Sequence, residues 1–380
     1  RTGQDMTDFY HHLAGQLAQL DQEGLRRTLV PVTRKEQGRL ASSGRLCLNL
    51  SGNDYLGLGG NRELIAELYR QLDERTLLPH FSPGATASPL MTGNSELYAR
   101  LEAKLAQLYG SGSCLVFNSG YHGNTGILPC LAGKGDLILA DRLCHASLID
   151  GMRLTRAETV RYHHLDYDQL AEMLRRKRHR FRHVFIVSES VFSMDGDAVP
   201  LREICALAER FGALVMADEA HATGVIGPTG AGLAEQLGLS NRVQVHMGTL
   251  GKALGSFGAY VAGSRDLIDY LINTVRAFIY TTALPPPVVA AAGAALAIVA
   301  NEPGRRDAVA RSGRRWPPGP CLPGRPAYPP GRGGWPGRWR CPGPLAACRT
   351  MPSRAVPHPG GRLPDRRRAR PRGAPASPRT

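Results

Sequence analysis

The first 310 residues of this 380-residue chain contain no tryptophan, no CxxC pair and no long apolar run. The longest apolar stretch, 288–300, has 13 residues and is too short for a membrane-spanning helix. The eight cysteines show no zinc-ligand spacing, so we expect free thiols, no metal site and a reducing, cytoplasmic compartment. The first ten residues also lack the apolar segment of a secretory signal.

Excess basic charge is absent from the body of the chain. Residues 1–310 carry 31 Lys and Arg against 31 Asp and Glu, whereas residues 311–380 carry 16 Arg, no Lys and one acid. The end segment therefore holds the whole net charge of +15, together with 17 of the 28 prolines. The neutral body gives no reason to expect nucleic-acid or membrane partners. Proline removes donors and fixes φ, so we predict a low-complexity, disordered tail over 311–380.

Three interpretations of this tail remain open. A change of reading frame near Ser312 would explain the abrupt shift in charge, because a GC-rich gene read out of frame yields Pro, Arg, Gly and Ala. We favour that interpretation. A natural disordered tail without function is the second, and an Arg-rich tail with interleaved Trp that binds nucleic acid or a partner is the third.

The body alternates between strand and helix patterns. An amphipathic helix is expected over 7–28 and a short strand over 45–50. Further strands are expected at 114–118, 137–140, 159–162, 183–188, 214–217, 243–247 and 258–262. Further helices are expected at 62–73, 95–109, 121–132, 145–155, 166–177, 200–211, 264–276 and 286–300. This alternation predicts an α/β fold with a mostly parallel seven-stranded sheet, which binds ligands at the carboxyl ends of its strands.

Polar residues follow five of these expected strands. In HMGTLGKALG (246–255), Lys252 lies in a glycine-rich turn among apolar neighbours, where a lowered pKa would make it a nucleophile; an ordinary surface lysine is the alternative. In DEAH (218–221), Asp218 at a buried strand end needs a cationic partner, unless it caps the next helix. The run GxxxxGK[ST] does not occur, so these letters do not indicate a helicase.

The other three clusters are weaker when taken singly. LVFNSGYHGN (115–124) is a strand, a turn and a helix start, which is a common phosphate-binding arrangement. His145 opens a helix, and Glu189, Ser193 and Asp195 share a turn; each also has a purely structural interpretation. Together, one lysine, one strand-end aspartate, two histidines and a phosphate-type turn fit pyridoxal phosphate (PLP) held through its aldehyde.

The same segments resemble the α-oxoamine synthases, which are fold-type I PLP enzymes. The similar stretches are SGNDYLGL (51–58), NSGYHGN (118–124), CHASLIDG (144–151), ESVFSMDGD (189–197), DEAHATGVIG (218–227), GTLGKALG (248–255) and TTALPP (281–286). They span about residues 45–300. The resemblance implies four segments: an N-terminal helix and strand (1–50), a PLP-binding large domain (51–285), the start of a C-terminal segment (286–310) and the tail (311–380).

The resemblance also implies roles for individual residues. Lys252 would bind the cofactor covalently, Asp218 would pair with its ring nitrogen, and His145 would stack on the ring, assist proton transfer and contact substrate. The other implied cofactor contacts are Gly120, Tyr121, Glu189, Ser193, His221, Thr249, Thr281 and Thr282. One of the two threonines would reach the phosphate of a partner subunit in an obligate homodimer with shared sites. Asn53 and Arg26 would contact the substrates.

The implied reaction condenses L-alanine with a pimeloyl thioester, carried by CoA or by a carrier protein, and releases CO2 to give 8-amino-7-oxononanoate for biotin synthesis. Two alternatives stay open. The amino acid could be glycine or serine, as in other members. The chain could also be a catalytically impaired PLP-binding protein, because the family's C-terminal domain and its substrate-gripping arginine are replaced here by the tail.

Overall fold

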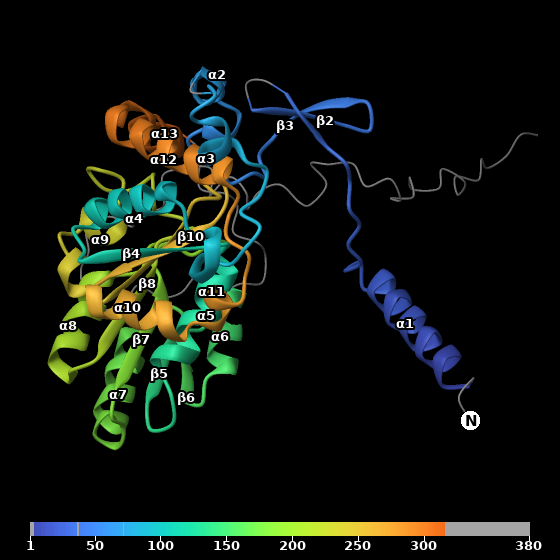
Figure 1. Cartoon of the computed structure of the whole chain (residues 1–380). Coiled ribbons are helices and arrows are strands. Elements are labelled where there is room, and N and C mark those ends of the chain that lie inside the picture. The colour runs from blue at the N-terminus through green and yellow to red at the C-terminus, as the bar shows by residue number, and fades with distance from the viewer. Residues whose placement is uncertain (1–3, 36–37, 71, 316–380) are drawn as a thin grey trace, which may run out of the picture. The chain divides into compact units, whose positions relative to one another are not determined.

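The computed structural model describes residues 4–35, 38–70 and 72–315, which fall into two compact units (Figure 1). The described residues up to Asn49 form the first unit and those from Leu50 form the second. The expected tail from residue 316 onward lies outside the described residues. The first unit holds helix α1 (Gln4–Gln22) and an antiparallel sheet of β1 (Thr33–Arg34), β2 (Arg39–Ser42) and β3 (Arg45–Leu48).

Helix α1 ends six residues before the predicted boundary at 28. Gly24 has φ of +67°, a left-handed conformation that a helix commonly adopts just past its end. The backbone N–H groups of Leu25 and Arg26 both donate to the carbonyl of Leu20, which completes the helix terminus. The prediction was wrong here because Leu25 continues the apolar spacing, whereas the glycine before it ends the helix.

The second unit is built on a seven-stranded sheet in the order β4-β10-β9-β8-β7-β5-β6. Among these seven strands β10 runs in one direction and the other six run in the opposite direction, so the prediction of a mostly parallel α/β sheet is confirmed. The strands are β4 (Ser113–Phe117), β5 (Leu137–Asp141), β6 (Glu158–Tyr162), β7 (Val184–Glu189), β8 (Leu214–Asp218), β9 (Val245–Thr249) and β10 (Ala259–Gly263). The turn of nine residues between β9 and β10 is too short for a parallel crossover, which explains the reversed direction of β10.

Helices cover both faces of this sheet. The α-helices described in the second unit are α2 (Arg62–Arg70), α3 (Leu77–Phe81), α4 (Glu96–Tyr109), α5 (Gly120–Leu131), α6 (Ala146–Leu154), α7 (Tyr167–Lys177), α8 (Leu201–Phe211), α9 (Leu233–Gln236), α10 (Arg265–Thr274), α11 (Arg276–Ile279), α12 (Pro286–Asn301) and α13 (Pro303–Arg315). Along β5, Ile138 and Ala140 pack in one apolar cluster with α5 and α6, whereas Leu137 and Leu139 pack in another with α7 and α8. This alternation places every second side chain on the same face, as a two-residue strand period requires.

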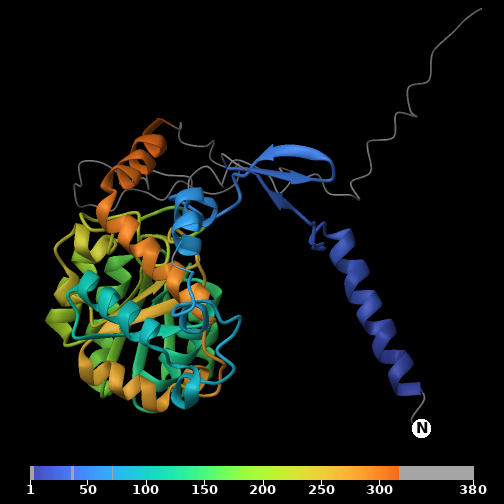
Figure 2. The ribbon, with the colours of Figure 1, turned by 45° about the horizontal axis from the view of Figure 1, so that its top comes forward.

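The second unit continues through α12 and α13. Val289 and Leu296 of α12 pack in one cluster with Leu101 and Leu105 of α4. In Figure 2, α12 and α13 are the helices in the orange colours near the end of the described chain. Helix α13 continues to Arg315, so the first five residues of the expected tail are helical. Taken over the described residues, no individual helix has the length and apolar character needed to cross a membrane. By length and composition alone, the bent pair α12 and α13 passes the same test.

The contact between α5 and α6 leaves no room for a side chain at Gly151. A Cβ atom placed there would lie 2.5 Å from the carbonyl oxygen of Asn124, whereas one placed at Gly293 of α12 would meet nothing within 4 Å. We expect Gly151→Ala to lower the free energy of unfolding by about 1–3 kcal/mol because the helices must separate. We expect Gly293→Ala to leave stability unchanged or to raise it by up to about 1 kcal/mol. Urea unfolding of both variants measures this, and equal stability of Gly151→Ala and the parent chain would contradict the packing argument.

Candidate active site

Lys252 lies in the tight turn between β9 and β10. The Thr249 hydroxyl donates to the carbonyl of Gly258 (3.0 Å) and accepts from the backbone N–H of Gly251 (3.2 Å), so it holds the turn closed. Leu250 and Leu254 are buried beside the lysine, as the sequence predicted. Burial lowers the pKa of Lys252, and the carboxyl groups of nearby Asp218 and Glu189 oppose that shift. Its amine is therefore more readily deprotonated than that of a surface lysine.

His221 contacts this amine directly. Its Nε2 lies 2.7 Å from Lys252 Nζ, and its Nδ1 lies 2.8 Å from the hydroxyl of Tyr55. A charged lysine can only donate, so Nε2 accepts, Nδ1–H donates to Tyr55, and the Tyr55 hydroxyl donates to Asn53 Oδ1 (3.1 Å). Burial, followed by the charges of Lys252 and His145, lowers the pKa of His221 to about 3. His221 is therefore neutral and orients the amine.

Two adjacent carboxylates at the end of β8 serve different purposes. Asp218 is buried, and its oxygens accept from Asn124 Nδ2 (2.8 Å) and from the backbone N–H of Ala220 (3.0 Å). Glu219 is fully buried and accepts from the backbone N–H groups of Leu233 and Ala234, each at 3.0 Å. The helix-capping interpretation of this motif therefore applies to Glu219, which holds the start of α9. Asp218 remains on the side of Lys252.

A third carboxyl lies beside Asp218 on the neighbouring strand. Glu189, the last residue of β7, pairs in register with Asp218, and its buried Oε1 has no hydrogen-bond partner. Burial and the charge of Asp218 raise the pKa of Glu189 to about 8, against the opposing effects of Lys252 and of the backbone N–H groups of His145 and Ser193. A buried oxygen without a donor next to a reactive amine indicates that the site accommodates a further polar group.

His145 lies at the N-terminus of α6. Its Nδ1 accepts from the backbone N–H of Ser147 (3.2 Å) and lies 2.7 Å from the Ser147 hydroxyl. Burial lowers the pKa of His145; the charge of Lys252 acts in the same direction and that of Asp218 opposes it. The imidazole is therefore neutral at physiological pH.

The turn after β4 is arranged as an anion site. Gly120 and Tyr121 begin α5, where backbone N–H groups have no carbonyl of the preceding turn to bind. A Cβ atom at Gly120 would come within 3.0 Å of Met247 Cε, so glycine lets the turn lie close to β9. Asn118 donates to Thr281 Oγ1 (3.0 Å) and to the carbonyl of Thr282 (2.8 Å) of the same chain. Both threonines thus lie beside this turn.

The structure brings together most of the residues that the sequence singled out, and it adds three. Tyr55, Asn124 and Ser147 contact His221, Asp218 and His145 but were not selected from the sequence. One signal could have found Asn124: it follows Gly120 by four residues and therefore shares its helix face. Arg26 belongs to the first unit, where it pairs with Asp21 (2.5 Å), so its contact with substrate stays a prediction.

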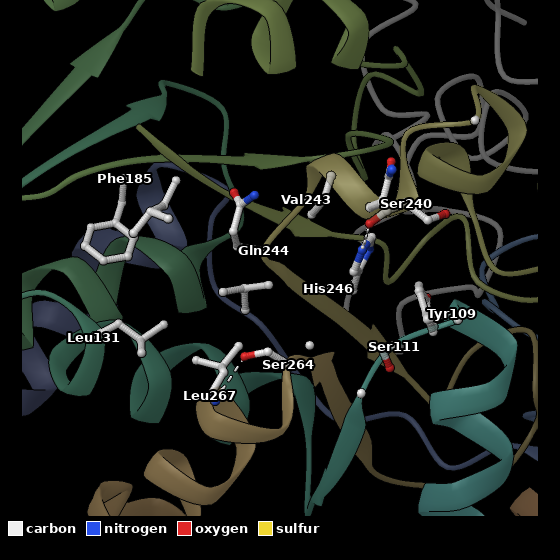
Figure 3. A pocket seen from close by; sticks show the side chains of 17 residues that line it. Tyr109, Ser111, Leu131, Phe185, Ser240, Val243, Gln244, His246, Ser264 and Leu267 are labelled. Atoms are coloured by element: carbon white, nitrogen blue, oxygen red, sulfur yellow. Dashed lines mark hydrogen bonds between the residues drawn. The ribbon is translucent and has the colours of Figure 1, made fainter. Parts of the chain in front are cut away.

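A cavity of about 840 Å³ lies at the opposite edge of the sheet, where β8 and β9 begin (Figure 3). Its polar side chains are largely engaged within the protein: His246 Nε2 donates to the carbonyl of Ser240 (2.9 Å), and Gln244 Oε1 accepts from the backbone N–H of Val215 (2.7 Å). The titratable groups gathered around Lys252 lie instead at the carboxyl edge, where parallel sheets bind their ligands.

Comparison with known proteins agrees with this arrangement. The family "Aminotransferase class I and II" matches residues 45–315. An 8-amino-7-oxononanoate synthase of Anaeromyxobacter sp. (strain K) is 48% identical over 294 residues, which cover 77% of this chain and 72% of the relative. One from Geobacter metallireducens is 44% identical over 313 residues, covering 82% of this chain and 78% of the relative. The chain belongs to the 8-amino-7-oxononanoate synthase family of class I and II aminotransferases.

Solved structures support the same family. A serine palmitoyltransferase of S. paucimobilis with bound PLP–myriocin superimposes with a TM-score of 0.73 at 29% identity, covering 81% of this chain and 78% of that one. An 8-amino-7-oxononanoate synthase from Francisella tularensis superimposes with a TM-score of 0.59 at 28% identity, covering 70% and 72%. Members of this family are PLP-dependent.

The residues of this synthase-family chain fit PLP. Asp218 offers a buried carboxylate to a pyridinium nitrogen, the start of α5 offers backbone donors to a phosphate, and Lys252 offers an amine of lowered pKa to an aldehyde. The unpartnered Oε1 of Glu189 is the observation that most directly requires a further group in the site. Which of these side chains touch the cofactor stays a prediction.

A cluster of His164 with two aspartates holds the loop that follows β7; His164 and Asp141 are buried, and Asp197 is half-exposed. His164 Nδ1 lies 2.9 Å from Asp141 Oδ1, and its Nε2 lies 3.5 Å from Asp197 Oδ2. The ring also packs edge-on against Phe192, at 4.4 Å between centroids. Burial alone would lower the pKa of His164, but the hydrogen bonds and charges of Asp141 and Asp197 outweigh it and raise the pKa to about 9. The imidazolium therefore ties β5 to the loop that carries Ser193.

The His164 cluster predicts a pH-dependent stability. Because the folded pKa lies above the unfolded value of 6.5, the contribution of His164 is complete below pH 6.5 and is lost as the pH rises through 9. We expect His164→Gln to lose about 3 kcal/mol of unfolding free energy at pH 6, with a gap that narrows as the pH rises from 6.5 to 9 and is small above pH 9. Exposed His163→Gln is the matched control and should change little. A pH-independent gap in urea unfolding would show that the ion cluster does not act as described.

Reductive trapping tests the choice of lysine. We expect sodium borohydride to fix one PLP per chain onto Lys252, detectable by peptide mass spectrometry and by the absorbance of the reduced adduct. Lys252→Ala should lose this trapping completely because, among the described residues, no other lysine amine lies beside Asp218 and His221. Lys104→Ala, at an exposed position of α4, is the control and should trap PLP like the parent chain. Trapping that persists in Lys252→Ala would refute the assignment.

Proposed function

We propose that this chain condenses L-alanine with a pimeloyl thioester to form 8-amino-7-oxononanoate, with release of CO2 and of the free thiol of CoA or of a carrier protein. The observation that carries the proposal is the hydrogen bond of 2.7 Å between Lys252 Nζ and neutral His221, flanked by the carboxyl groups of Asp218 and Glu189. The names of the relatives support the substrate pair.

Each of these side chains has a defined task in that reaction. PLP, when bound, accepts the electron pair that is left at the substrate Cα. Lys252 removes the Cα proton with its Nζ, whose lowered pKa makes the neutral, basic form easier to reach. His221 accepts a hydrogen bond at Nε2 and so keeps Nζ in place. Asp218 supplies fixed negative charge, and Asn53 contributes its side-chain amide to the substrate carboxylate.

We further propose that the enzyme is a cytoplasmic homodimer with shared sites. Large apolar side chains are exposed on loops and helix ends after β4, β7, β9 and α11, at Tyr121, Met194, Phe257 and Tyr280. Such a group of exposed apolar residues around a catalytic edge suits an interface with a second copy. Thr281 and Thr282 lie next to Tyr280, so either could reach the partner's phosphate site. The free thiols of Cys114, Cys130 and Cys144 suit a reducing compartment.

A second candidate is condensation with serine or glycine in place of alanine. The serine palmitoyltransferase structure superimposes with the higher TM-score, 0.73 against 0.59. The sequence relatives at 44–48% identity favour alanine.

Product analysis with competing amino acids decides between these candidates. We expect the full chain with PLP and pimeloyl-CoA to form 8-amino-7-oxononanoate with alanine, and little product with glycine or serine, as judged by mass spectrometry and thiol release. We also expect slow turnover and weak alanine binding compared with the Anaeromyxobacter relative, because residues 311–380 contain no matching arginine motif.

A chimera tests the cause of slow turnover. Replacing residues 311–380 by the C-terminal part of that relative should restore its rate, whereas Lys252→Ala in the chimera should abolish it. A preference for serine would overturn the alanine assignment. Turnover of the unmodified chain at the rate of the relative would overturn the predicted impairment. Sequencing the gene across codons 295–320 in all three frames shows whether the tail is encoded as written.

A further inference from the structure

We propose that Ser147 and Asn124 are positioning residues that hold His145 as a neutral imidazole with its proton on Nε2. The inference rests on the proposed function only for its catalytic consequence. Its structural part concerns hydrogen bonds among this chain's own residues and can be tested without turnover.

The contacts form a continuous path from Asp218 to His145. Asn124 Nδ2 lies 2.8 Å from Asp218 Oδ2 and 2.9 Å from Ser147 Oγ, and Ser147 Oγ lies 2.7 Å from His145 Nδ1. Asn124 and Ser147 are each 1% exposed, so water does not compete for these bonds. The path joins the end of β8 to the start of α6 through the middle of α5.

The carboxylate at one end and the Ser147 backbone N–H at the other fix the direction of the bonds in this path. The opposite orientation of the Asn124 amide would place Oδ1 against Asp218, where two negative oxygens would repel, so Nδ2 must face the carboxylate. Its second hydrogen then goes to Ser147 Oγ, which accepts it and keeps its own hydrogen to donate. Because the Ser147 backbone N–H already donates to His145 Nδ1, this nitrogen is an acceptor and receives the hydroxyl hydrogen as well.

His145 Nδ1 consequently receives two donors. The Ser147 hydroxyl and the Ser147 backbone N–H (3.2 Å) both approach it, so Nδ1 carries no hydrogen. A neutral ring must then carry its hydrogen on Nε2, and a doubly protonated ring would lose the bond from the Ser147 backbone N–H and reverse the bond to the Ser147 hydroxyl. The charged and titratable groups that face His145 are Asp218, Lys252, Glu189 and His221. Of these, Asp218 favours protonation of the ring, whereas burial and the charge of Lys252 oppose it, and the bonds to Ser147 act in the same direction as burial.

The consequence for the reaction is a ring of fixed orientation that offers a donor. Because Nδ1 is already bonded to Ser147, the N–H group at Nε2 is the polar group of the ring that can give a hydrogen bond or a proton to substrate. Loss of the Ser147 hydroxyl would let the ring rotate, change tautomer or take up a proton.

Nitrogen NMR of histidine in the full chain tests the structural part. We expect the His145 signals to report Nδ1 without and Nε2 with a proton, and Ser147→Ala to raise the pKa of His145 by about one unit and to mix the tautomers. Asn124→Ala should do the same, because Ser147 then loses the donor that directs its hydroxyl. Ser147→Thr keeps a hydroxyl and should behave as the parent chain. Ser111→Ala, whose hydroxyl contacts backbone carbonyls at the opposite edge of the sheet, is the matched control.

Exchange of the alanine Cα hydrogen for deuterium in the PLP-loaded protein tests the catalytic part. We expect Ser147→Ala to slow exchange about tenfold. The pH at which the exchange rate falls on the acid side should move upward, because the pKa of His145 rises. PLP trapping on Lys252 should stay intact. Circular dichroism shows whether the Ser147→Ala variant is folded. If the folded variant keeps the tautomer and the pKa of His145, the inference is overturned, even when its exchange is slow. If the parent chain forms no product, the proposed function is contradicted. If its His145 nevertheless carries the hydrogen on Nε2, the positioning role of Ser147 and Asn124 still holds.

Discussion

The carboxylate of Asp218 is buried at the end of a central strand, and its surroundings follow from the cost of keeping it there. An ionised carboxylate without partners is expensive to bury, so each oxygen must accept hydrogen bonds and a cation must lie nearby. Asn124 and the backbone of Ala220 supply the bonds, and Lys252 supplies positive charge. Glu189 on the adjacent strand is itself buried and lies beside this charge, and both effects raise its pKa to about 8. Burial and one neighbouring charge together thereby disfavour ionisation of Glu189.

The sheet topology decides which residues can meet this carboxylate. Because β4, β5, β7, β8 and β9 all run in one direction, the residues after each strand gather at a single edge. The one reversed strand matters equally. The short turn before β10 folds back at this edge, so Lys252 stays beside the ends of β8 and β9, and the hydroxyl of Thr249 is used to close the turn. Glu219 fixes α9 on the other side of the same loop, which leaves Asp218 facing the lysine.

The sequence allowed the sheet and the main site residues to be predicted because both depend on local pattern. A strand that ends in DEAH, and another followed by a glycine-rich turn with a lysine, are visible without tertiary contacts. Asn124 and Ser147 were missed because their roles depend on how closely α5 lies against α6, which Gly151 permits and no local pattern reveals. The end of α1 at Gln22 shows the converse error, since apolar spacing continued where Gly24 had already ended the helix.

The two histidines of the site are both made neutral by burial and by the charge of Lys252, but they carry their hydrogens on opposite nitrogens. His221 accepts from Lys252 at Nε2 and donates from Nδ1 to Tyr55, whereas His145 accepts at Nδ1 from Ser147. One ring therefore presents an acceptor to the amine, and the other keeps its hydrogen on the opposite nitrogen as a donor. Two imidazolium ions beside Lys252 would repel one another and the lysine. Because both rings are neutral, the amine stays close to Asp218 without this repulsion. The opposite tautomers give the site both an acceptor and a donor without any further charge.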